Sequence, residues 1–215
     1  MRPLSIYVHV PFCRSRCGYC GFYSGCDLSL REPYMAALVR ATETAPSADC
    51  EVRTIYFGGG TPTLLGTGLT TVLKAIRRRW QVAADAEITT EANPNMVTPE
   101  LLLALRAAGF NRISFGLQDC EDGMLRLLGR SHTTAEGEAA VAMAKAAGFK
   151  NISVDFMLAT PGQTPEKAAR LAQYGLSLAV PHLSSYLLKI EEGTPFARSG
   201  MAVNCPDADM AADCY

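Results

Sequence analysis

Three cysteines near the start of the chain have the spacing of an iron-sulfur site. Cys13, Cys17 and Cys20 form the pattern C-x3-C-x2-C directly after a short apolar run, IYVHV. Three thiolates can bind three irons of a [4Fe-4S] cluster and leave the fourth iron open to a ligand that is not protein. A structural zinc site needs four ligands, and no second C-x2-C or H-x3-5-H pair is present, so only Cys26 could complete one. The spacing favours the cluster over zinc.

Composition restricts the classes of protein that could carry this site. The chain has 215 residues, of which 48% are hydrophobic and 19% charged, as in an ordinary globular protein. Its net charge of -1 provides no field to attract nucleic acid or an anionic membrane. No run of 18 apolar residues and no signal peptide are found, so we expect a cytoplasmic chain without a membrane span. In a reducing compartment the clustered cysteines indicate metal rather than disulfides.

Short β-branched and aromatic runs alternate with helical patterns along the chain, which predicts β/α units around a parallel sheet. Thr98, Thr133 and Thr164 are predicted N-caps of helices, and Gly109 and Gly148 predicted helix ends. The segment Ala107–Ser114 recurs as Ala146–Ser153, with the period of one unit. The predicted strands are Ser5–Val10, Arg53–Phe57, Glu87–Ala92, Arg112–Leu117, Asn151–Leu158 and His182–Ile190.

Six strands are fewer than the eight of a complete barrel, which typically needs about 250 residues. The prediction is therefore an α/β fold, a partial six-stranded (β/α)6 TIM-like barrel forming one domain over residues 1–215. A helix start at Pro206-Asp207 lies close to Tyr215, so we expect a domain that is truncated at its C-terminus, with a C-terminal domain absent.

Several motifs together resemble those of the radical S-adenosylmethionine (SAM) superfamily. Besides the cysteines they are YxHxPF before Cys13, YFGGGTPT at residues 56–63, EANP at 91–94, RISFGLQ at 112–118, GRSH at 129–132 and PGQT at 161–164. The order resembles the branch that contains oxygen-independent coproporphyrinogen III oxidase and the HemW-type haem chaperones. The resemblance implies that SAM binds the open iron of the cluster and is cleaved, on reduction, to methionine and a 5′-deoxyadenosyl radical.

The resemblance also implies a set of SAM contacts at or near strand ends. A glycine-rich turn lets the backbone approach a ligand closely, arginine offers a planar fork to a carboxylate, and aspartate accepts hydrogen bonds from ribose hydroxyls. Taken singly, the glycines could simply form a tight turn, and Tyr7 could simply pack in the core. His9, His132 and His182 are predicted to be structural, and no catalytic side chain is assigned. The implied SAM contacts are Tyr7, Tyr19, Gly59, Gly60, Thr61, Glu91, Gln118, Arg130 and Asp155.

Two functions of different kinds follow from this branch. The first is a HemW-type protein, which binds the cluster, SAM and haem and delivers haem to acceptor proteins. The second is the oxidase, an enzyme of porphyrin biosynthesis, whose pattern continues with a fourth cysteine two residues after the third, where this chain has Phe22. Phe22 favours the chaperone.

HemW-type chains are expected to continue into a C-terminal region with an H-N-x-x-Y-W stretch for haem handling, which does not occur before Tyr215. Radical SAM modification of tRNA is disfavoured by the near-neutral charge, and a truncated, inactive barrel remains as the simplest alternative.

Overall fold

A computed structural model describes residues 2–46 and 49–215. Six strands form one parallel sheet in the order of the chain, and they are β1 (Arg2–Val10), β2 (Cys50–Gly59), β3 (Gln81–Ala92), β4 (Arg112–Gln118), β5 (Asn151–Leu158) and β6 (His182–Leu187). The main helices are α1 (Arg31–Thr44), α2 (Gly68–Arg79), α3 (Pro99–Ala108), α5 (Thr134–Ala146) and α6 (Pro165–Ser177). Shorter ones are α4 (Asp122–Leu128), α7 (Pro195–Arg198) and α8 (Ala208–Cys214). The predicted six-stranded α/β half-barrel is confirmed.

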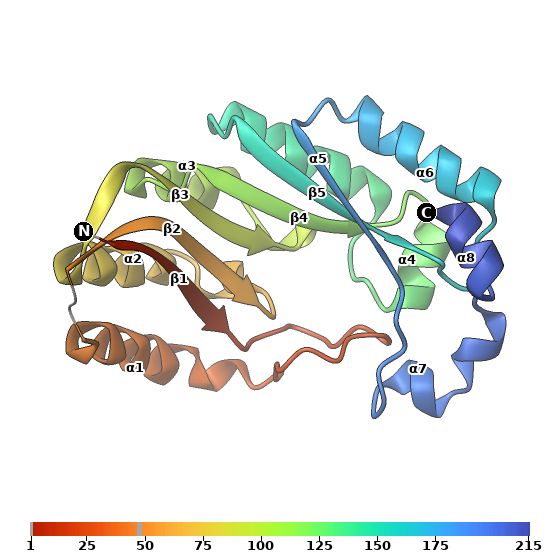
Figure 1. The fold of residues 1–215 in the computed structure, drawn as a ribbon, viewed down its shortest axis with the longest axis horizontal. Coiled ribbons are helices and arrows are strands. Elements are labelled where there is room, and N and C mark those ends of the chain that lie inside the picture. Colours follow the sequence, from red (N-terminus) through yellow and green to blue (C-terminus); the bar gives the residue numbers. More distant parts are fainter. Residues whose placement is uncertain (1, 47–48) are drawn as a thin grey trace.

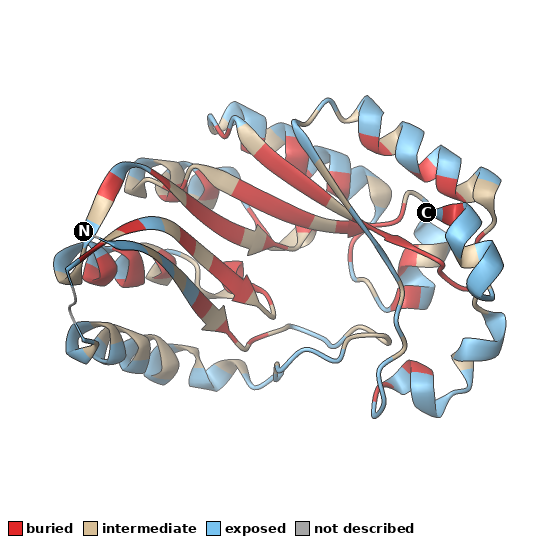
Figure 2. Ribbon diagram, viewed as in Figure 1, coloured by how far each residue is buried: buried red, intermediate tan, exposed pale blue. Residues whose placement is uncertain are grey.

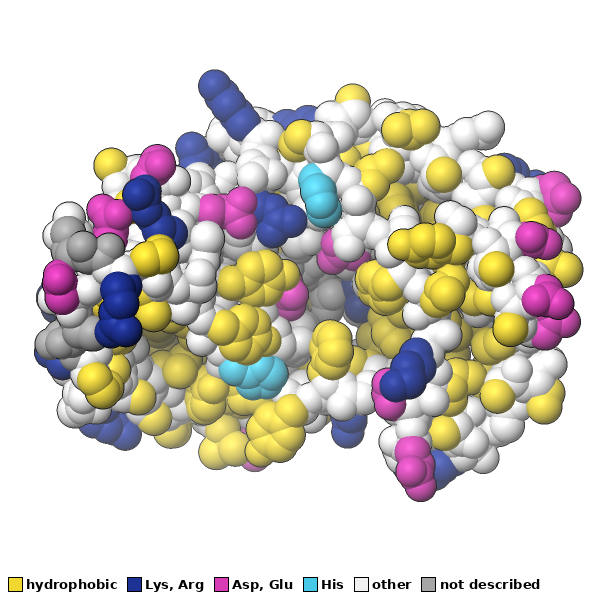
Figure 3. All heavy atoms as spheres, in the orientation of Figure 1, with side chains coloured by type: hydrophobic (Ala, Val, Ile, Leu, Met, Phe, Trp, Pro, Cys, Tyr) yellow, Lys and Arg dark blue, Asp and Glu magenta, His cyan; other side chains and the backbone are white. Residues whose placement is uncertain are grey.

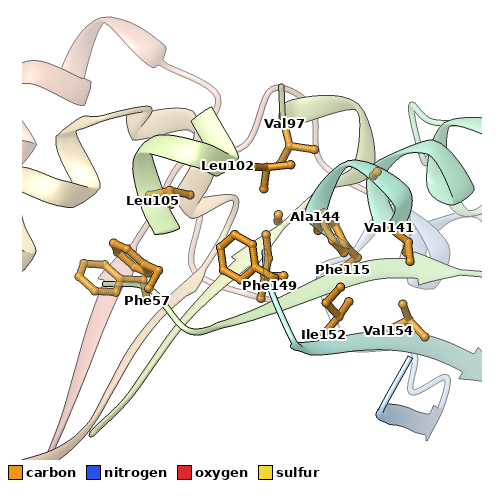
Figure 4. Close-up of a cluster of buried hydrophobic side chains, with 14 of the residues drawn as sticks. Phe57, Val97, Leu102, Leu105, Phe115, Val141, Ala144, Phe149, Ile152 and Val154 are labelled. Atoms are coloured by element: carbon orange, nitrogen blue, oxygen red, sulfur yellow. The ribbon is translucent and has the colours of Figure 1, made fainter. Parts of the chain in front are cut away.

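Helices cover the outer side of the curved sheet, as Figure 1 shows. Alternate residues of each strand point to opposite faces, so one set packs under the helices and the other faces the inside of the half-barrel. In β4, Ile113, Phe115 and Leu117 are fully buried in the core, whereas Arg112, Ser114 and Gly116 belong to the opposite face. Figure 2 shows the buried strands, and Figure 4 shows Phe115 beside Val141 and Ala144 of α5. The inner face is therefore left free for polar side chains.

The strand boundaries differ from the prediction mainly in four strands. β1 begins at Arg2 rather than Ser5, and β2 is Cys50–Gly59 rather than Arg53–Phe57. β3 begins at Gln81, because Glu51 and Val52 of β2 already pair with Gln81 and Val82 before a register shift. β6 ends at Leu187 rather than Ile190. The Leu188 amide still donates to the Leu158 carbonyl, but the following residues form a turn, and Ile190 packs against a small apolar cluster around Phe196. The predicted strand end was wrong because apolar residues continue into a packed loop.

The helix ends follow the predicted signals. Thr98, Thr133 and Thr164 accept backbone hydrogen bonds at the starts of α3, α5 and α6, and Thr133 forms a complete capping box with Glu136. Gly109 ends α3 in the left-handed conformation, with φ of 103°.

Within residues 2–46 and 49–215, no helix has the length and apolar character needed to cross a bilayer.

His132 gives stability a predictable dependence on pH. It is buried between α4 and α5, where its Nε2 lies 3.2 Å from the Leu117 carbonyl, and burial lowers its pKa to about 4. As pH falls, the unfolded chain binds a proton on His132 before the folded chain does. The contribution of neutral His132 to the free energy of unfolding is therefore complete above about pH 6.5 and is lost as pH falls toward 4. The resulting loss of unfolding free energy should reach about 3 kcal/mol.

We expect His132→Gln, which cannot bind a proton, to flatten this part of the profile of unfolding free energy against pH, measured by urea denaturation. The matched control is His182→Gln, at an exposed histidine on β6. Equal slopes for the unmodified protein and His132→Gln would show that His132 is not the group responsible.

Candidate functional site

A cavity of about 520 Å³ lies at the carboxyl ends of the strands. The three cysteines of the C-x3-C-x2-C pattern line it, together with the turn after β2 and the ends of β3 to β6. Figure 3 shows the hollowed face, with hydrophobic side chains on both sides of the hollow. Of the predicted site residues, Cys13, Cys17, Cys20, Tyr19, Gly59, Gly60, Thr61, Glu91, Gln118, Arg130 and Asp155 all line the cavity.

The loop that carries the cysteines is fixed at several points. The Cys13 amide donates to the Gly25 carbonyl at 2.9 Å, and the Gly25 amide donates to Pro11 at 2.9 Å, so the loop closes on itself. Its middle is tied to α4 and α7, since Gly18 donates to the Leu128 carbonyl and accepts from Phe196. Burial raises the pKa of the Cys20 thiol. The backbone of this loop is therefore held by hydrogen bonds on both sides of the cysteines.

The donor set fits a cluster that binds one iron per thiol. All three thiols are free and partly accessible from the cavity, and Cys26 does not line it. In the described part of the chain, no three Cys, His, Asp or Glu side chains converge on a single metal ion. The thiolates of a cubane lie farther apart than the ligands of one ion, because each binds a different iron.

The glycine turn after β2 is shaped by close approach to the cysteine loop. A Cβ on Gly60 would lie 2.5 Å from the Phe12 carbonyl oxygen and 2.9 Å from Cys13 Sγ. The Gly60 amide donates to the Val10 carbonyl, and the Thr61 amide donates to the Phe12 carbonyl. Gly59 has φ of 117°, which favours glycine. The triplet therefore brings the backbone of β2 against the first cysteine.

Glu91 lies at the end of β3 with both carboxylate oxygens engaged. Tyr56 Oη donates to Oε1 at 2.6 Å, and the Gly59 amide donates to Oε2 at 3.2 Å. Burial raises the pKa of Glu91, and burial beside this carboxylate raises the pKa of Tyr56 as well. A carboxylate held in this way is oriented before any ligand arrives.

Arg130 enters the cavity just after α4. Gly129, with φ of 78°, ends that helix in the left-handed conformation and packs against the backbone of Cys17. The Arg130 side chain is partly buried, and its Nη2 donates to Asn93 Oδ1 at 2.6 Å and to the Gly116 carbonyl at 2.7 Å. Its Nη1 donates to Cys17 Sγ at 3.5 Å. The Nε atom is buried and has no hydrogen-bond partner.

Gln118 and Asp155 complete the inner wall on β4 and β5. Gln118 is buried, accepts a hydrogen bond from Tyr186 Oη at 2.6 Å, and has φ of 71° at a register shift between β4 and β5. Such conformations are costly for residues other than glycine and gather at functional sites. Asp155 accepts from Ser114 Oγ at 3.1 Å, and burial raises the pKa of its carboxyl group.

The two predicted tyrosines are placed differently. Tyr19 lines the cavity but also packs edge-on against Phe196, with ring centroids 6.4 Å apart. Tyr7 is 60% exposed and does not line the cavity. Its ring stacks on Tyr56 at 6.1 Å, and its hydroxyl lies 3.1 Å from His9 Nδ1. The structure thus brings Tyr7 near the site without placing it in the cavity wall.

Sequence reasoning missed several residues of the wall. Asn93 lines the cavity, and Tyr56, which does not line it, donates a hydrogen bond to Glu91 of the wall. Both lie inside motifs, and their positions at or near strand ends were the available signal. Tyr186 and Leu187, at the end of β6, and Leu188, just after it, also line the cavity; they lie in a segment that resembles the same family, but no binding role was assigned to them.

Comparisons with known proteins agree with this geometry. Residues 7–175 match the model of the radical SAM superfamily, and the chain belongs to that superfamily. It is 38% identical to a protein of Mycobacterium tuberculosis named "Heme chaperone HemW", over the whole chain and 57% of the relative, and 38% identical to the Escherichia coli protein of the same name. A mouse mitochondrial protein, "Radical S-adenosyl methionine domain-containing protein 1", is 37% identical over 98% of the chain and 49% of its own length.

Among solved structures, coproporphyrinogen III oxidase (HemN) from Escherichia coli superposes with a TM-score of 0.89. The two are 32% identical, and the match covers 99% of this chain and 50% of the oxidase. The chain thus spans about half the length of the relatives it matches.

Proposed function

We propose that this chain is the cluster- and SAM-binding core of a HemW-type haem chaperone. The observation that carries the proposal is the cavity itself, which three free thiols, a glycine turn and Arg130 line together. Haem binding is supported by the relatives that are 36 to 38% identical, which are named haem chaperones. Delivery of haem to acceptor proteins is part of the same proposal.

Cys13, Cys17 and Cys20 would each bind one iron of a [4Fe-4S] cluster, with SAM at the remaining iron. When bound and reduced, the cluster supplies the one-electron chemistry that cleaves the sulfonium of SAM. The protein's residues would hold SAM in place. The guanidinium of Arg130 suits the carboxylate of SAM, and Glu91 and Asp155 suit its ribose hydroxyls. Gly59, Gly60 and Thr61 allow its close approach, and Gln118 and Tyr19 contribute to its surroundings, whereas Tyr7 lies outside the cavity wall and acts only through its stacking on Tyr56.

The oxidase is the second candidate, and the structural likeness to coproporphyrinogen III oxidase favours it. Phe22 argues against it. This side chain lines the cavity and is 68% exposed, at the position where the oxidase pattern has a further cysteine. A phenyl ring cannot supply the thiol of that cysteine, so we prefer the chaperone.

Tyr56→Phe should weaken SAM binding without loss of iron. The change removes the hydrogen bond of 2.6 Å that orients Glu91, and hydrogen bonds to charged groups contribute about 1.5 to 3 kcal/mol. We expect an increase in the Kd for SAM of about tenfold or more, measured by equilibrium dialysis of the reconstituted protein. The control is Tyr174→Phe on α6, whose ring packs on Phe156 away from the cavity. An unchanged Kd in Tyr56→Phe would remove Glu91 from the SAM site.

The two candidate functions are separated by one anaerobic experiment on the protein as the organism makes it. The reduced protein is given SAM and coproporphyrinogen III and the porphyrins are separated by chromatography; in parallel, haem-loaded protein is mixed with a haem-free acceptor. We expect haem transfer and no conversion above that of a Cys13→Ala control. Conversion above the control would establish the oxidase and reject the chaperone.

A further inference from the structure

Asn93 is a polar residue of the cavity wall that the proposed SAM contacts do not include. It follows the last residue of β3, and Pro94 comes next, which favours the extended backbone that Asn93 adopts, with φ of -88° and ψ of 141°. In this conformation its amide group reaches two neighbours at once. Its Oδ1 accepts from Arg130 Nη2 at 2.6 Å, and its Nδ2 donates to Thr61 Oγ1 at 3.1 Å.

The two neighbours each reach a cysteine thiol. Arg130 Nη1 donates to Cys17 Sγ at 3.5 Å, and Thr61 Oγ1 donates to Cys13 Sγ at 3.9 Å. The five side chains form one continuous chain of hydrogen bonds, from Cys17 through Arg130, Asn93 and Thr61 to Cys13. From Arg130 to Cys13, each donor points toward the next member, so that the bonds polarise one another.

This arrangement places hydrogen-bond donors on sulfur atoms in a buried setting. Thr61 is 2% exposed, and Arg130 is enclosed by the cavity wall. Hydrogen bonds to the sulfur ligands of an iron-sulfur cluster are one of the means by which a protein sets its reduction potential. Adding one electron from an external reductant makes the cluster more negative, and donors aimed at its thiolates stabilise that negative charge. A residue that orients such a donor affects the cluster indirectly, in the same way that a residue hydrogen-bonded to a metal ligand affects the metal.

We propose that Asn93 is a positioning residue that aligns Arg130 and Thr61 on Cys17 and Cys13 and thereby raises the reduction potential of the cluster. This inference rests on the proposed function, because it requires the cluster to be bound. Without Asn93, Thr61 loses the amide that orients its hydroxyl, and Arg130 keeps only the Gly116 carbonyl as a partner for Nη2, so both donors are less well aligned and the potential falls.

The test is a potentiometric titration of the reconstituted protein, followed by EPR of the reduced cluster. Asn93→Leu keeps the approximate shape of the side chain and removes its amide group. We expect full iron content and a midpoint potential shifted to a more negative value. The control is Asn95→Leu, because Asn95 bonds the backbone and hydroxyl of Ser131 and has no part in the chain to the thiols. An unchanged potential with full iron content would overturn the proposal.

Thr61 provides a second pair of variants in case Asn93→Leu does not fold. Thr61→Val removes the hydroxyl that donates to Cys13, whereas Thr61→Ser retains it. We expect a more negative potential in the first and a value near that of the unmodified protein in the second. Equal potentials in the two would overturn the proposal. Absence of bound iron from the unmodified protein would reject the proposed function and this inference together.

Discussion

Replacing Cys17 by alanine is expected to abolish cluster binding. Anaerobically reconstituted protein should contain about four irons and four sulfides per chain, and Cys17→Ala essentially none, because two remaining thiols leave two irons without a protein ligand. Iron and sulfide analysis with absorption spectra of the reconstituted protein gives the answer. Of the other single variants, only Cys13→Ala, which removes another of the three thiolates, should lose as much iron.

The matched control is Cys26→Ala, in the same loop. The side chain of Cys26 is exposed and does not line the cavity, so its removal should leave the iron content unchanged. A four-cysteine zinc site would behave differently, since it would need Cys26 as its fourth ligand. Stoichiometric zinc that survives Cys17→Ala would contradict the account.

Gly60→Ala should have the second largest effect. The new Cβ would lie 2.5 Å from the Phe12 carbonyl oxygen and 2.9 Å from Cys13 Sγ, and neither backbone nor a ligating sulfur can move without displacing the first cysteine. Overpacking of this kind costs about 1 to 3 kcal/mol. We expect most of the bound iron to be lost and the unfolding free energy to fall by that amount, measured by iron analysis and urea denaturation.

Gly123→Ala provides the comparison. Gly123 lies in α4, and a Cβ there would meet no atom within 4 Å. Because alanine is the better helix former, this change should raise the unfolding free energy by about 0.5 to 1 kcal/mol and leave the iron content unchanged. If Gly60→Ala bound iron as well as Gly123→Ala, the close packing of the glycine turn on the cysteine loop would be wrong.

The strands and helix ends could be predicted because their signals are local. Apolar runs of β-branched and aromatic residues specified the six strands, and Thr98, Thr133 and Thr164 specified helix starts by the side-chain bonds that they make. The end of β6 could not be predicted in this way. Leu188 and Ile190 continue the apolar pattern, but beyond Leu187 they pack on a separate apolar cluster of Leu128, Met157 and Phe196, whose members are far apart in the sequence.

The site could be predicted only where a motif specified the residue. The cysteines and Gly60 belong to segments whose spacing carries the chemistry, and the structure brings them together. Tyr56 and Asn93 were missed because their roles depend on partners that lie 35 and 37 residues away. The left-handed backbone of Gln118 arises from a register shift between two strands, which a single sequence does not specify.

The central claim is that the cavity holds a cluster with SAM at its open iron. The most direct test is the EPR spectrum of the dithionite-reduced protein, recorded with and without SAM. Because Arg130, Glu91 and the glycine turn face the same cavity as the three thiols, we predict that SAM changes the spectrum of the reduced cluster. A reduced cluster whose spectrum is identical with and without saturating SAM would contradict the account.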